Sequence, residues 1–321
     1  MRIGFFELEG WEEKFIREAF AGHDLYLSKE KIDEKTLPEQ KNFEVISVFI
    51  RSHITTKVLK ALPRLKLVTT RSTGYDHLDI EACRSRGVAA AFVPGYGDNT
   101  VAEFAFGLIL ALSRKICEAR ARVKNEGKFT TDGLVGFDLA GRTLGVIGTG
   151  RIGKHAVRIG KGFGMNVVAY DVYHDDAFAK EMGFPYVELE ELLAQSDIAT
   201  IHCPYLPTTH HLINKSNIGF MKRGAYLINT ARGAILETGA LISALKSGQL
   251  RGAGIDVLED EDKMKIGNMS PASELLAMPN VIITPHNAFN SEEALKRILD
   301  ITIDNIKSFV AGKPVNLAQE L

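Results

Sequence analysis

The stretch Leu144-Gly-Val-Ile-Gly-Thr-Gly-Arg-Ile-Gly153 decides the fold, because an apolar strand runs directly into three glycines at the spacing G-x-G-x-x-G. At this spacing the first glycine permits a tight turn, and the second lets the backbone approach a pyrophosphate. The third lets the following helix pack closely against the strand. The stretch therefore predicts a dinucleotide-binding turn. The loop residues expected to meet the cofactor are Gly148, Gly150, Arg151, Ile152 and Gly153.

An acidic residue ends the next predicted strand, residues 166–171, and it distinguishes between the two nicotinamide dinucleotides. Asp171 can accept hydrogen bonds from the hydroxyls of the adenosine ribose, and it repels the 2′-phosphate of NADP. Val172 and Tyr173 follow it, so no arginine is placed there to bind that phosphate. The expected cofactor is therefore NAD.

Length and composition indicate a globular protein of two domains. The chain has 321 residues, about twice the length of a typical domain. Its 39 basic and 40 acidic residues leave a net charge of −1, which argues against a dedicated nucleic-acid binder. Three scattered cysteines form neither a disulfide framework nor a zinc motif, so we expect no bound metal. The longest apolar stretch, residues 101–112, is too short to span a bilayer, and we expect a cytoplasmic protein without a membrane partner.

Short apolar runs rich in β-branched residues alternate with helical stretches along the whole chain. This alternation is typical of parallel sheets whose two faces are covered by helices. It predicts an α/β protein with two Rossmann-like, doubly wound parallel-sheet domains. The predicted strands are residues 2–6, 44–50, 66–70 and 88–93, followed by residues 143–148, 166–171, 198–202, 225–229, 254–257 and 281–284.

Two helices mark where the chain passes between the predicted domains. Residues 100–112 are apolar nearly all round, and residues 100–103, Thr-Val-Ala-Glu, match a capping box at the start of this helix. Near the other end, apolar residues repeat at a spacing of three to four over residues 291–310. We expect a substrate-binding domain and an inserted NAD-binding Rossmann domain, formed by residues 1–99 plus 291–321 and by residues 100–290.

Six segments, in order along nearly the whole chain, together resemble one family. The segments are Arg71-Ser-Thr-Gly74, Val93-Pro-Gly-Tyr96, the glycine loop with Asp171, Asn229-Thr-Ala-Arg-Gly233, Gly254-Ile-Asp-Val-Leu-Glu-Asp-Glu261 and Pro279-Asn-Val-Ile-Ile-Thr-Pro-His286. The set resembles the D-isomer-specific 2-hydroxyacid dehydrogenases. This resemblance implies an NAD-dependent oxidoreductase that acts on a small 2-oxo or 2-hydroxy acid. It also implies a homodimer.

The resemblance implies three catalytic residues, Arg232, Glu261 and His286. Arg232 would bind a substrate carboxylate through two hydrogen bonds, although by residue type alone an arginine after a strand is more often a surface residue. His286 would protonate the carbonyl oxygen of a 2-oxo acid, and Glu261 would hold the imidazole and favour its charged form. The choice of Glu261 depends on the resemblance, because residues 259–262 are all acidic and such a run is more often a solvated turn.

The same resemblance names further contacts to cofactor and substrate. The backbone at Thr73 and Gly74 is expected to meet the substrate carboxylate. Tyr96 and Phe289 would close over the short side chain of pyruvate, although such aromatic residues are as often part of a core. The expected cofactor contacts beyond the glycine loop are Asp171, His202, Pro204, Thr230 and Asp256, the last at the nicotinamide carboxamide.

Tyr96 and Phe289 resemble the aromatic pair of the D-lactate dehydrogenase branch of this family, and the resemblance implies an enzyme that reduces pyruvate with NADH. Residues 49–52, Phe-Ile-Arg-Ser, instead resemble the phosphoglycerate dehydrogenase branch, where Arg51 would bind a phosphorylated acid, or it simply faces solvent. A glyoxylate or hydroxypyruvate reductase, or another D-2-hydroxyacid dehydrogenase, is an alternative. An NAD-sensing, corepressor-like binding protein is another, because corepressors that resemble this family share its arginine, glutamate and histidine.

Overall fold

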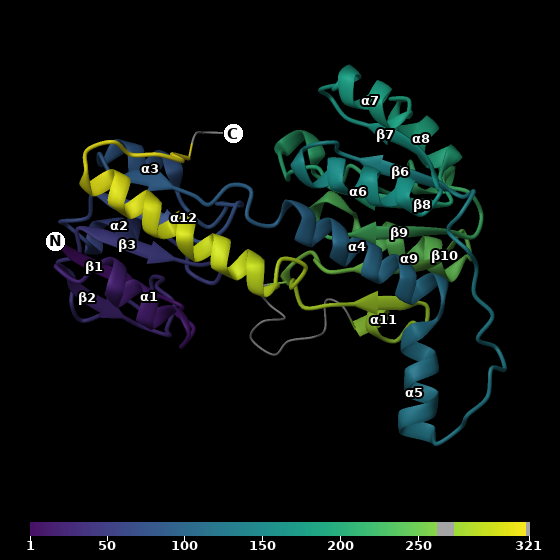
Figure 1. Ribbon diagram of the computed structural model, residues 1–321, viewed down its shortest axis with the longest axis horizontal. Coiled ribbons are helices and arrows are strands. Elements are labelled where there is room, and N and C mark those ends of the chain that lie inside the picture. The colour runs from purple at the N-terminus through teal and green to yellow at the C-terminus, as the bar shows by residue number, and fades with distance from the viewer. Residues whose placement is uncertain (262–272, 319–321) are drawn as a thin grey trace. The chain divides into compact units, whose positions relative to one another are not determined.

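Two α/β units make up the chain in the computed structural model, which describes residues 1–261 and 273–318. Unit 1 comprises Met1–Tyr96 and Ser291–Leu321, and unit 2 comprises Gly97–Asn290. The boundaries expected from the sequence lie between residues 99 and 100 and between residues 290 and 291. The elements of both units are labelled in Figure 1.

A five-stranded sheet forms the centre of unit 1, and all of its strand pairs are parallel. The strand order is β2-β1-β3-β4-β5. The strands are β1 (Arg2–Phe5), β2 (Asp24–Leu27), β3 (Val45–Val48), β4 (Leu67–Thr70) and β5 (Ala89–Ala91). The sequence missed β2, an edge strand of four residues that are all at least partly exposed, so it lacks the continuous apolar run that marks its neighbours.

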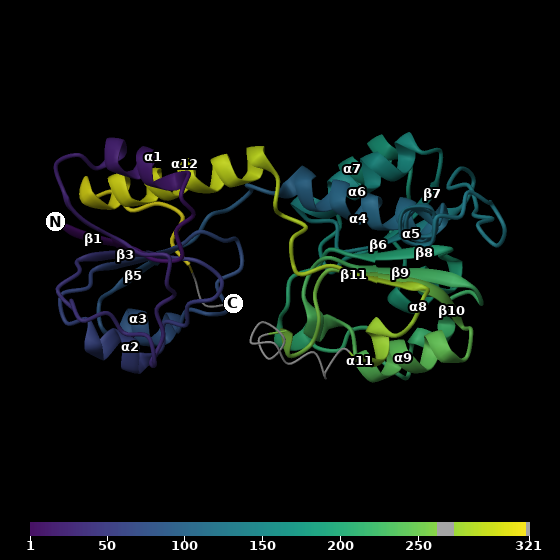
Figure 2. The same cartoon turned by 90° about the horizontal axis from the view of Figure 1, so that it is seen from below.

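Helices cover both faces of this sheet. In Figure 2, α1 (Glu12–Ala19) and α12 (Glu292–Val310) lie on one face, and α2 (Thr56–Ala61) and α3 (Ile80–Ser85) lie on the other. Neighbouring strand residues alternate between the two cores: Val45 belongs to the cluster that contains Leu299 of α12, and Ile46 belongs to the cluster that contains Val58 of α2. The amphipathic helix predicted near the end of the chain is confirmed, and the Ser291 hydroxyl caps it by accepting the Ala294 N–H.

A six-stranded parallel sheet forms the centre of unit 2, in the order β11-β10-β9-β8-β6-β7. An isolated parallel bridge between Ala169 and Tyr186 adds a rudimentary strand beside β7. With that bridge counted as the third strand of the unit, the order is 3-2-1-4-5-6-7. Its first six strands have the order that is typical of dinucleotide-binding domains, and β11 adds a seventh strand beside β10. The strands are β6 (Thr143–Ile147), β7 (Asn166–Tyr170), β8 (Ile198–Ile201), β9 (Ala225–Asn229), β10 (Leu250–Ile255) and β11 (Val281–Ile283).

The helices of unit 2 also form two layers. Figure 2 shows α4, α6 and α7 on one face of the sheet and α8, α9 and α11 on the other. The helices are α4 (Asp98–Ser113), α5 (Ile116–Glu126), α6 (Arg151–Gly162), α7 (Asp176–Met182), α8 (Leu189–Gln195), α9 (Thr238–Lys246) and α11 (Ser273–Leu276), with 3₁₀ turns η1 (Pro207–Thr209), η2 (Ile218–Phe220) and η3 (Gly233–Ile235). The prediction of two parallel-sheet α/β domains is therefore confirmed.

The predicted capping box at residues 100–103 is wrong. Helix α4 begins at Asp98, so its N-cap is Gly97, three residues before the predicted N-cap Thr100, and no side chain caps the helix there. Thr100 lies inside the helix and is buried, so its backbone has the helical conformation that an N-cap residue lacks. An acidic residue in the first turn, Asp98, complements the positive end of the helix dipole instead.

Within the described ranges, no helix combines the length and hydropathy that crossing a membrane requires. The cysteines Cys83, Cys117 and Cys203 are all free.

Candidate active site

The glycine loop after β6 is built as the sequence predicts. Gly148 has a φ of +92°, and a Cβ on it would overlap the backbone of Cys203, which follows β8. A Cβ on Gly153 would overlap the Gly148 carbonyl oxygen. Gly150 differs, because no other atom lies within 4 Å of the point where its Cβ would be. The space next to Gly150, the N-cap of α6, is therefore open, which suits a phosphate group at the N-terminus of this helix.

Asp171 lies beside this loop with its carboxylate held from two sides. The Thr149 N–H and hydroxyl donate to Oδ2 at 2.6 and 3.1 Å, and the Tyr173 N–H donates to Oδ1 at 3.0 Å. The Thr149 hydroxyl also lies 2.8 Å from the hydroxyl of Tyr186. Sequence reasoning missed Thr149 and Tyr186, although Thr149 stands between the first two glycines of the motif.

Three buried polar atoms near the carboxyl ends of the unit 2 strands have no hydrogen-bond partner within the described part of the chain. They are His202 Nδ1 after β8, Thr230 Oγ1 after β9 and Asn287 Oδ1 in the segment that follows β11. Open α/β sheets bind their ligands at this edge, and a buried polar atom without a partner costs free energy. The three atoms therefore fit a polar cofactor. His202 and Thr230 were expected there, Pro204 nearby is exposed, and Asn287 was missed although it follows His286 directly.

The ring of His202 is held in its neutral form. Burial lowers the pKa of this imidazole to about 4, and its Nε2 lies 2.9 Å from the Thr200 hydroxyl. A neutral ring offers one donor and one acceptor nitrogen. His202 is therefore suited to hydrogen bonding rather than to charge pairing at neutral pH.

His286 and Glu261 form a direct pair. The His286 Nδ1 lies 2.8 Å from Glu261 Oε1, and both side chains are largely buried. His286 has a φ of +53°, in the left-handed region that is uncommon for residues other than glycine, although asparagine, aspartate and histidine adopt it more often than the rest. Its N–H donates to the Asp256 carbonyl oxygen at 2.8 Å, which ties the strained residue to the end of β10.

Asp256 organises the loop that carries His286. Its buried carboxylate accepts the Thr284 hydroxyl at 2.5 Å, the Asn287 N–H at 3.0 Å and the Ala288 N–H at 2.9 Å. Oδ1 takes the first two of these bonds and Oδ2 takes the third, so Oδ2 retains acceptor capacity. The residue expected to bind the carboxamide thus also fixes the histidine loop.

Arg232 follows β9 in a turn that other groups close. The Asn229 side chain donates to the Arg232 carbonyl oxygen at 2.9 Å, and the Arg232 Nη1 donates to the Ala231 carbonyl oxygen at 2.8 Å. A Cβ on the next residue, Gly233, would overlap the backbone of Leu258. Only glycine therefore lets the segment after β10 lie directly against the arginine turn.

The acidic residues in the run 259–262 differ in the groups that they contact. Glu261 pairs with His286, as the family resemblance implies. Glu259 instead accepts the Thr238 N–H at 2.7 Å and lies 2.6 Å from His211 Nε2. Asp262 lies outside the described residues. The run is therefore not a simple solvated turn.

The substrate residues expected from the sequence belong to both units. Thr73 and Gly74 follow β4 in unit 1, where the Thr73 hydroxyl donates to the Val93 carbonyl oxygen at 2.8 Å. Tyr96, also in unit 1, accepts a bond from Arg297 Nε at its carbonyl oxygen, at 2.6 Å. Phe289 belongs to unit 2.

A buried charge network lies at the carboxyl ends of the unit 1 strands. Arg71 is almost fully buried, donates to the Phe6 and Glu7 carbonyl oxygens at 2.8 Å each and lies 3.5 Å from Glu12. Burial raises the pKa of the Glu12 carboxyl, even though the neighbouring Arg71 acts in the opposite direction. The Glu7 carboxylate accepts the Ser52 N–H at 3.0 Å and pairs with Arg51 Nε at 3.2 Å. These charged side chains are engaged with one another and with backbone groups. We therefore interpret them as structural residues that hold together the segments after β1, β3 and β4.

Comparisons with known proteins agree with this geometry. Residues 106–288 match the model of the family described as D-isomer specific 2-hydroxyacid dehydrogenase, NAD binding domain. A 2-hydroxyacid dehydrogenase homolog of Haemophilus influenzae is 37% identical over 98% of this chain and 97% of its own length. A glyoxylate reductase of Korarchaeum cryptofilum is 36% identical over 92% of this chain and 89% of its own.

Among solved structures, the D-lactate dehydrogenase of Aquifex aeolicus, complexed with NAD and lactic acid, superposes with a TM-score of 0.88 at 37% identity. The match covers 97% of this chain and 96% of that one. The resemblance seen in the sequence is thus confirmed at the level of the family and of the cofactor. The chain belongs to the D-isomer-specific 2-hydroxyacid dehydrogenases, NAD-binding oxidoreductases.

Proposed function

We propose that the protein is a D-lactate dehydrogenase that reduces pyruvate with NADH. The observation that carries this proposal is the Glu261–His286 pair at 2.8 Å, on a loop fixed by the buried carboxylate of Asp256. A carboxylate behind an imidazole orients the ring and stabilises its charged form. Such a ring can donate a proton to a substrate oxygen and accept it back in the reverse direction.

The Gly148–Gly153 loop, Asp171, His202 and Thr230 would hold NADH, which when bound would supply the hydride for the carbonyl carbon of the 2-oxo acid. His286 uses Nδ1 for Glu261, so Nε2 is the nitrogen that gives the proton to the carbonyl oxygen. Arg232 binds the substrate carboxylate through its planar guanidinium and adds positive charge beside the developing alkoxide. Thr73, Gly74, Tyr96 and Phe289 are the proposed substrate contacts.

The environment of Arg51 favours an unphosphorylated acid. Its Nε pairs with Glu7, whose side chain is almost completely buried. A substrate phosphate would need the positive charge of Arg51, but the Glu7 carboxylate already neutralises that charge. This pairing supports pyruvate over a phosphorylated 2-oxo acid.

Glyoxylate reduction is the second candidate, and a relative favours it. The Korarchaeum cryptofilum protein that matches most of this chain at 36% identity is a glyoxylate reductase. Glyoxylate lacks the methyl group of pyruvate, so Tyr96 and Phe289 would have less to contact.

A panel of 2-oxo acids tests the proposal. Pyruvate, glyoxylate, hydroxypyruvate and 3-phosphohydroxypyruvate are each offered with NADH and with NADPH. Both enantiomers of the product are assayed for every acid except glyoxylate, whose product glycolate is achiral. We expect the highest kcat/KM for pyruvate with NADH and a D-lactate product. A preference for glyoxylate or hydroxypyruvate would replace the first candidate by the second. NADH binding without turnover of any acid would favour the corepressor-like alternative.

We also propose a homodimer, which the surface around α5 supports. This helix buries none of its residues, and Ile116 and Val123 on it are about half exposed. In the loop that follows, Phe129 is 95% and Val135 79% exposed. Exposed apolar side chains gathered in one segment commonly mark a protein interface. Sedimentation velocity is expected to give twice the 35.3 kDa chain mass, and a monomer at micromolar concentration would contradict the proposal.

A further inference from the structure

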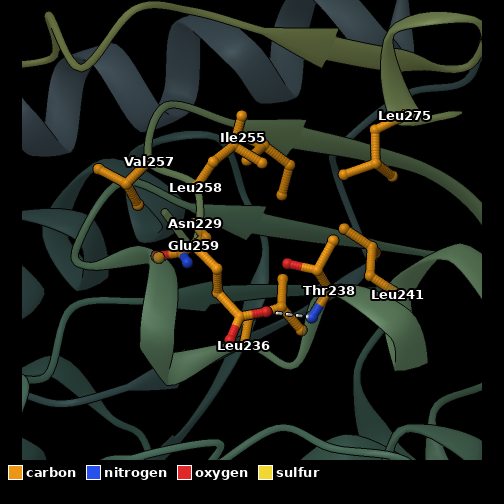
Figure 3. Close-up of a pocket in the computed structure, with 10 residues that line it drawn as sticks. Asn229, Leu236, Thr238, Leu241, Ile255, Val257, Leu258, Glu259 and Leu275 are labelled. Atoms are coloured by element: carbon orange, nitrogen blue, oxygen red, sulfur yellow. Dashed lines mark hydrogen bonds between the residues drawn. The ribbon is translucent and has the colours of Figure 1, made fainter. Parts of the chain in front are cut away.

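The short segment after β10 places two carboxylates on different partners. Glu259 and Glu261 are two residues apart, a spacing at which extended chain directs both side chains to the same side. Asp260 between them has a φ of +56°, which breaks this alternation. Glu261 therefore reaches His286, while Glu259 reaches His211 and the first residue of α9, Thr238. Figure 3 shows Glu259 directed at the start of that helix.

Glu259 is connected to the turn of Arg232 along two routes. The backbone of residues 258 and 259 lies directly against Gly233, where a Cβ would overlap it. The second route passes through His211, whose ring pairs with Glu259 and whose N–H donates to the Ala234 carbonyl oxygen at 2.8 Å. The turn that carries Arg232 is thus attached to Glu259 from both sides.

This region has little room to adjust. The cavity behind Gly233 is lined by Leu236, Leu241, Ile255 and Leu275, among others, and measures about 10 Å³ (Figure 3). That volume holds one water molecule at most. A displaced Glu259 would therefore transmit its movement to its neighbours, because close-packed interiors transmit strain.

Glu259 is ionised at neutral pH. Burial acts to raise the pKa of its carboxyl, but the hydrogen bonds from Thr238 and His211 outweigh burial and hold the pKa below its usual value. The Glu259 carboxylate also caps α9, because it accepts the N–H of Thr238, the first residue of this helix. The N-cap residue Glu237 makes no side-chain bond to the helix. A charged acceptor with two donors fixes its neighbours more firmly than a neutral one.

We propose that Glu259 is a positioning residue that holds the Arg232 turn in register with the Glu261–His286 pair. The inference rests on the proposed function, since it assigns Arg232 to the substrate carboxylate. Glu259 acts through the turn and does not touch the substrate. One four-residue segment, residues 258–261, thus positions both the guanidinium of Arg232 and the imidazole of His286.

Substitution of Glu259 tests the inference. Glu259→Ala removes the contacts to His211 and Thr238 together, and Glu259→Gln keeps an acceptor but loses the charge. We expect Glu259→Ala to raise KM for the 2-oxo acid at least tenfold and to weaken binding of oxamate, an unreactive analogue, to the same degree. The Kd for NADH should change less than twofold. Glu259→Gln should fall between this variant and the wild type.

Glu237→Gln serves as the matched control. It removes an acid from the adjacent position at the start of α9, where the carboxylate accepts the Lys215 N–H instead. This variant should keep the KM of the wild type. A Glu259→Ala variant that is less heat-stable but has unchanged KM and oxamate binding would reduce Glu259 to a helix cap and overturn the inference.

A double-mutant cycle with Arg232→Lys gives the second readout. If Glu259 acts through Arg232, Glu259→Ala weakens oxamate binding much less in the Arg232→Lys protein than in the wild type. Additive losses would overturn the inference. Wild-type turnover is measured in the same series, so a failure of the proposed function shows as absent turnover, and a failure of the positioning role shows as additive losses in an active enzyme.

Discussion

His286 has an unusual backbone conformation that allows a clean test of its proton-transfer role. Asparagine tolerates a positive φ, so His286→Asn should keep the loop in place while removing the proton donor. General acid catalysis contributes typically about 10²- to 10⁴-fold, and we expect kcat to fall by that factor. NADH fluorescence titration should give an unchanged Kd. Loss of NADH binding together with turnover would mean that the histidine is structural.

His202 makes stability depend on pH in a defined window. Its pKa in the folded protein is lowered to about 4, against about 6.5 in an unfolded chain, so protonation favours unfolding. Above about pH 7 the ring is neutral in both states and stability is unaffected. As the pH falls towards 4, the preferential protonation of the unfolded chain removes about 3 kcal/mol of the free energy of unfolding. Denaturant unfolding of the wild type and of His202→Gln between pH 7.5 and pH 4 measures it. The wild type should lose about 3 kcal/mol more than the variant, and parallel curves would contradict the assignment.

For single residues, the sequence predicted chemical roles more successfully than it predicted hydrogen-bond partners. Arg232, Glu261 and His286 could be named because the segments around them resemble a family, and the structure brings Glu261 to His286. The partners of Glu259 and the three bonds to Asp256 could not be named, because they join segments far apart in the chain. Asp256 was assigned only to the cofactor, whereas much of its carboxylate serves the histidine loop.

Substitutions of glycines in helix α6 and in the loop before it can distinguish an effect on NADH binding from an effect on the stability of the fold. Space around Gly150 is open, so Gly150→Ala should leave the unfolding free energy of the cofactor-free protein within about 1 kcal/mol of the wild type. The added methyl group would occupy the space assigned to the pyrophosphate, so the Kd for NADH should rise at least tenfold. Thermal unfolding without cofactor and NADH titration measure the two effects.

Two other glycines, both in helix α6, provide comparison variants for Gly150→Ala. Gly153→Ala should damage both stability and NADH binding, because its methyl group overlaps the Gly148 carbonyl oxygen. Gly162→Ala, at the last residue of α6, meets no atom within 4 Å and should leave NADH binding unchanged. If Gly150→Ala bound NADH normally, the pyrophosphate would have to lie elsewhere.

Elements were predicted where their signal is local. The strands of unit 2 read as continuous apolar runs because both faces of the sheet are covered, and each appears in the structure with ends shifted by a few residues. Thr100 shows the limit of a local motif, since its capping box is satisfied equally by a residue inside a helix. The edge strand β2 needs its neighbour β1 to be recognised, and that pairing is not local.

The two units differ in how their cores are assembled from the chain. Both hydrophobic clusters of unit 2 draw all their members from residues 102–283. One cluster of unit 1 combines strand residues such as Ile3 and Val45 with Leu299 and Ile306 of α12. Unit 2 thus has a complete core within a continuous stretch, whereas unit 1 needs both ends of the chain.

A fragment of residues 97–290 should therefore fold alone. We expect a single cooperative unfolding transition and NADH binding with a Kd within tenfold of the full chain, measured by circular dichroism and fluorescence titration. A fragment of residues 1–96 should remain unfolded, because the face of its sheet that α12 covers would be exposed to water. A stable 1–96 fragment would contradict this account of the core.

The position of α12 in unit 1 has a consequence for biosynthesis. Translation proceeds from the N-terminus, and domains generally fold as units while the ribosome is still elongating. The first ninety-six residues emerge early but lack their closing helix until residue 310 has left the exit tunnel. The nascent chain therefore carries an uncovered apolar sheet face until α12 emerges, after every residue of the cofactor-binding unit has been made.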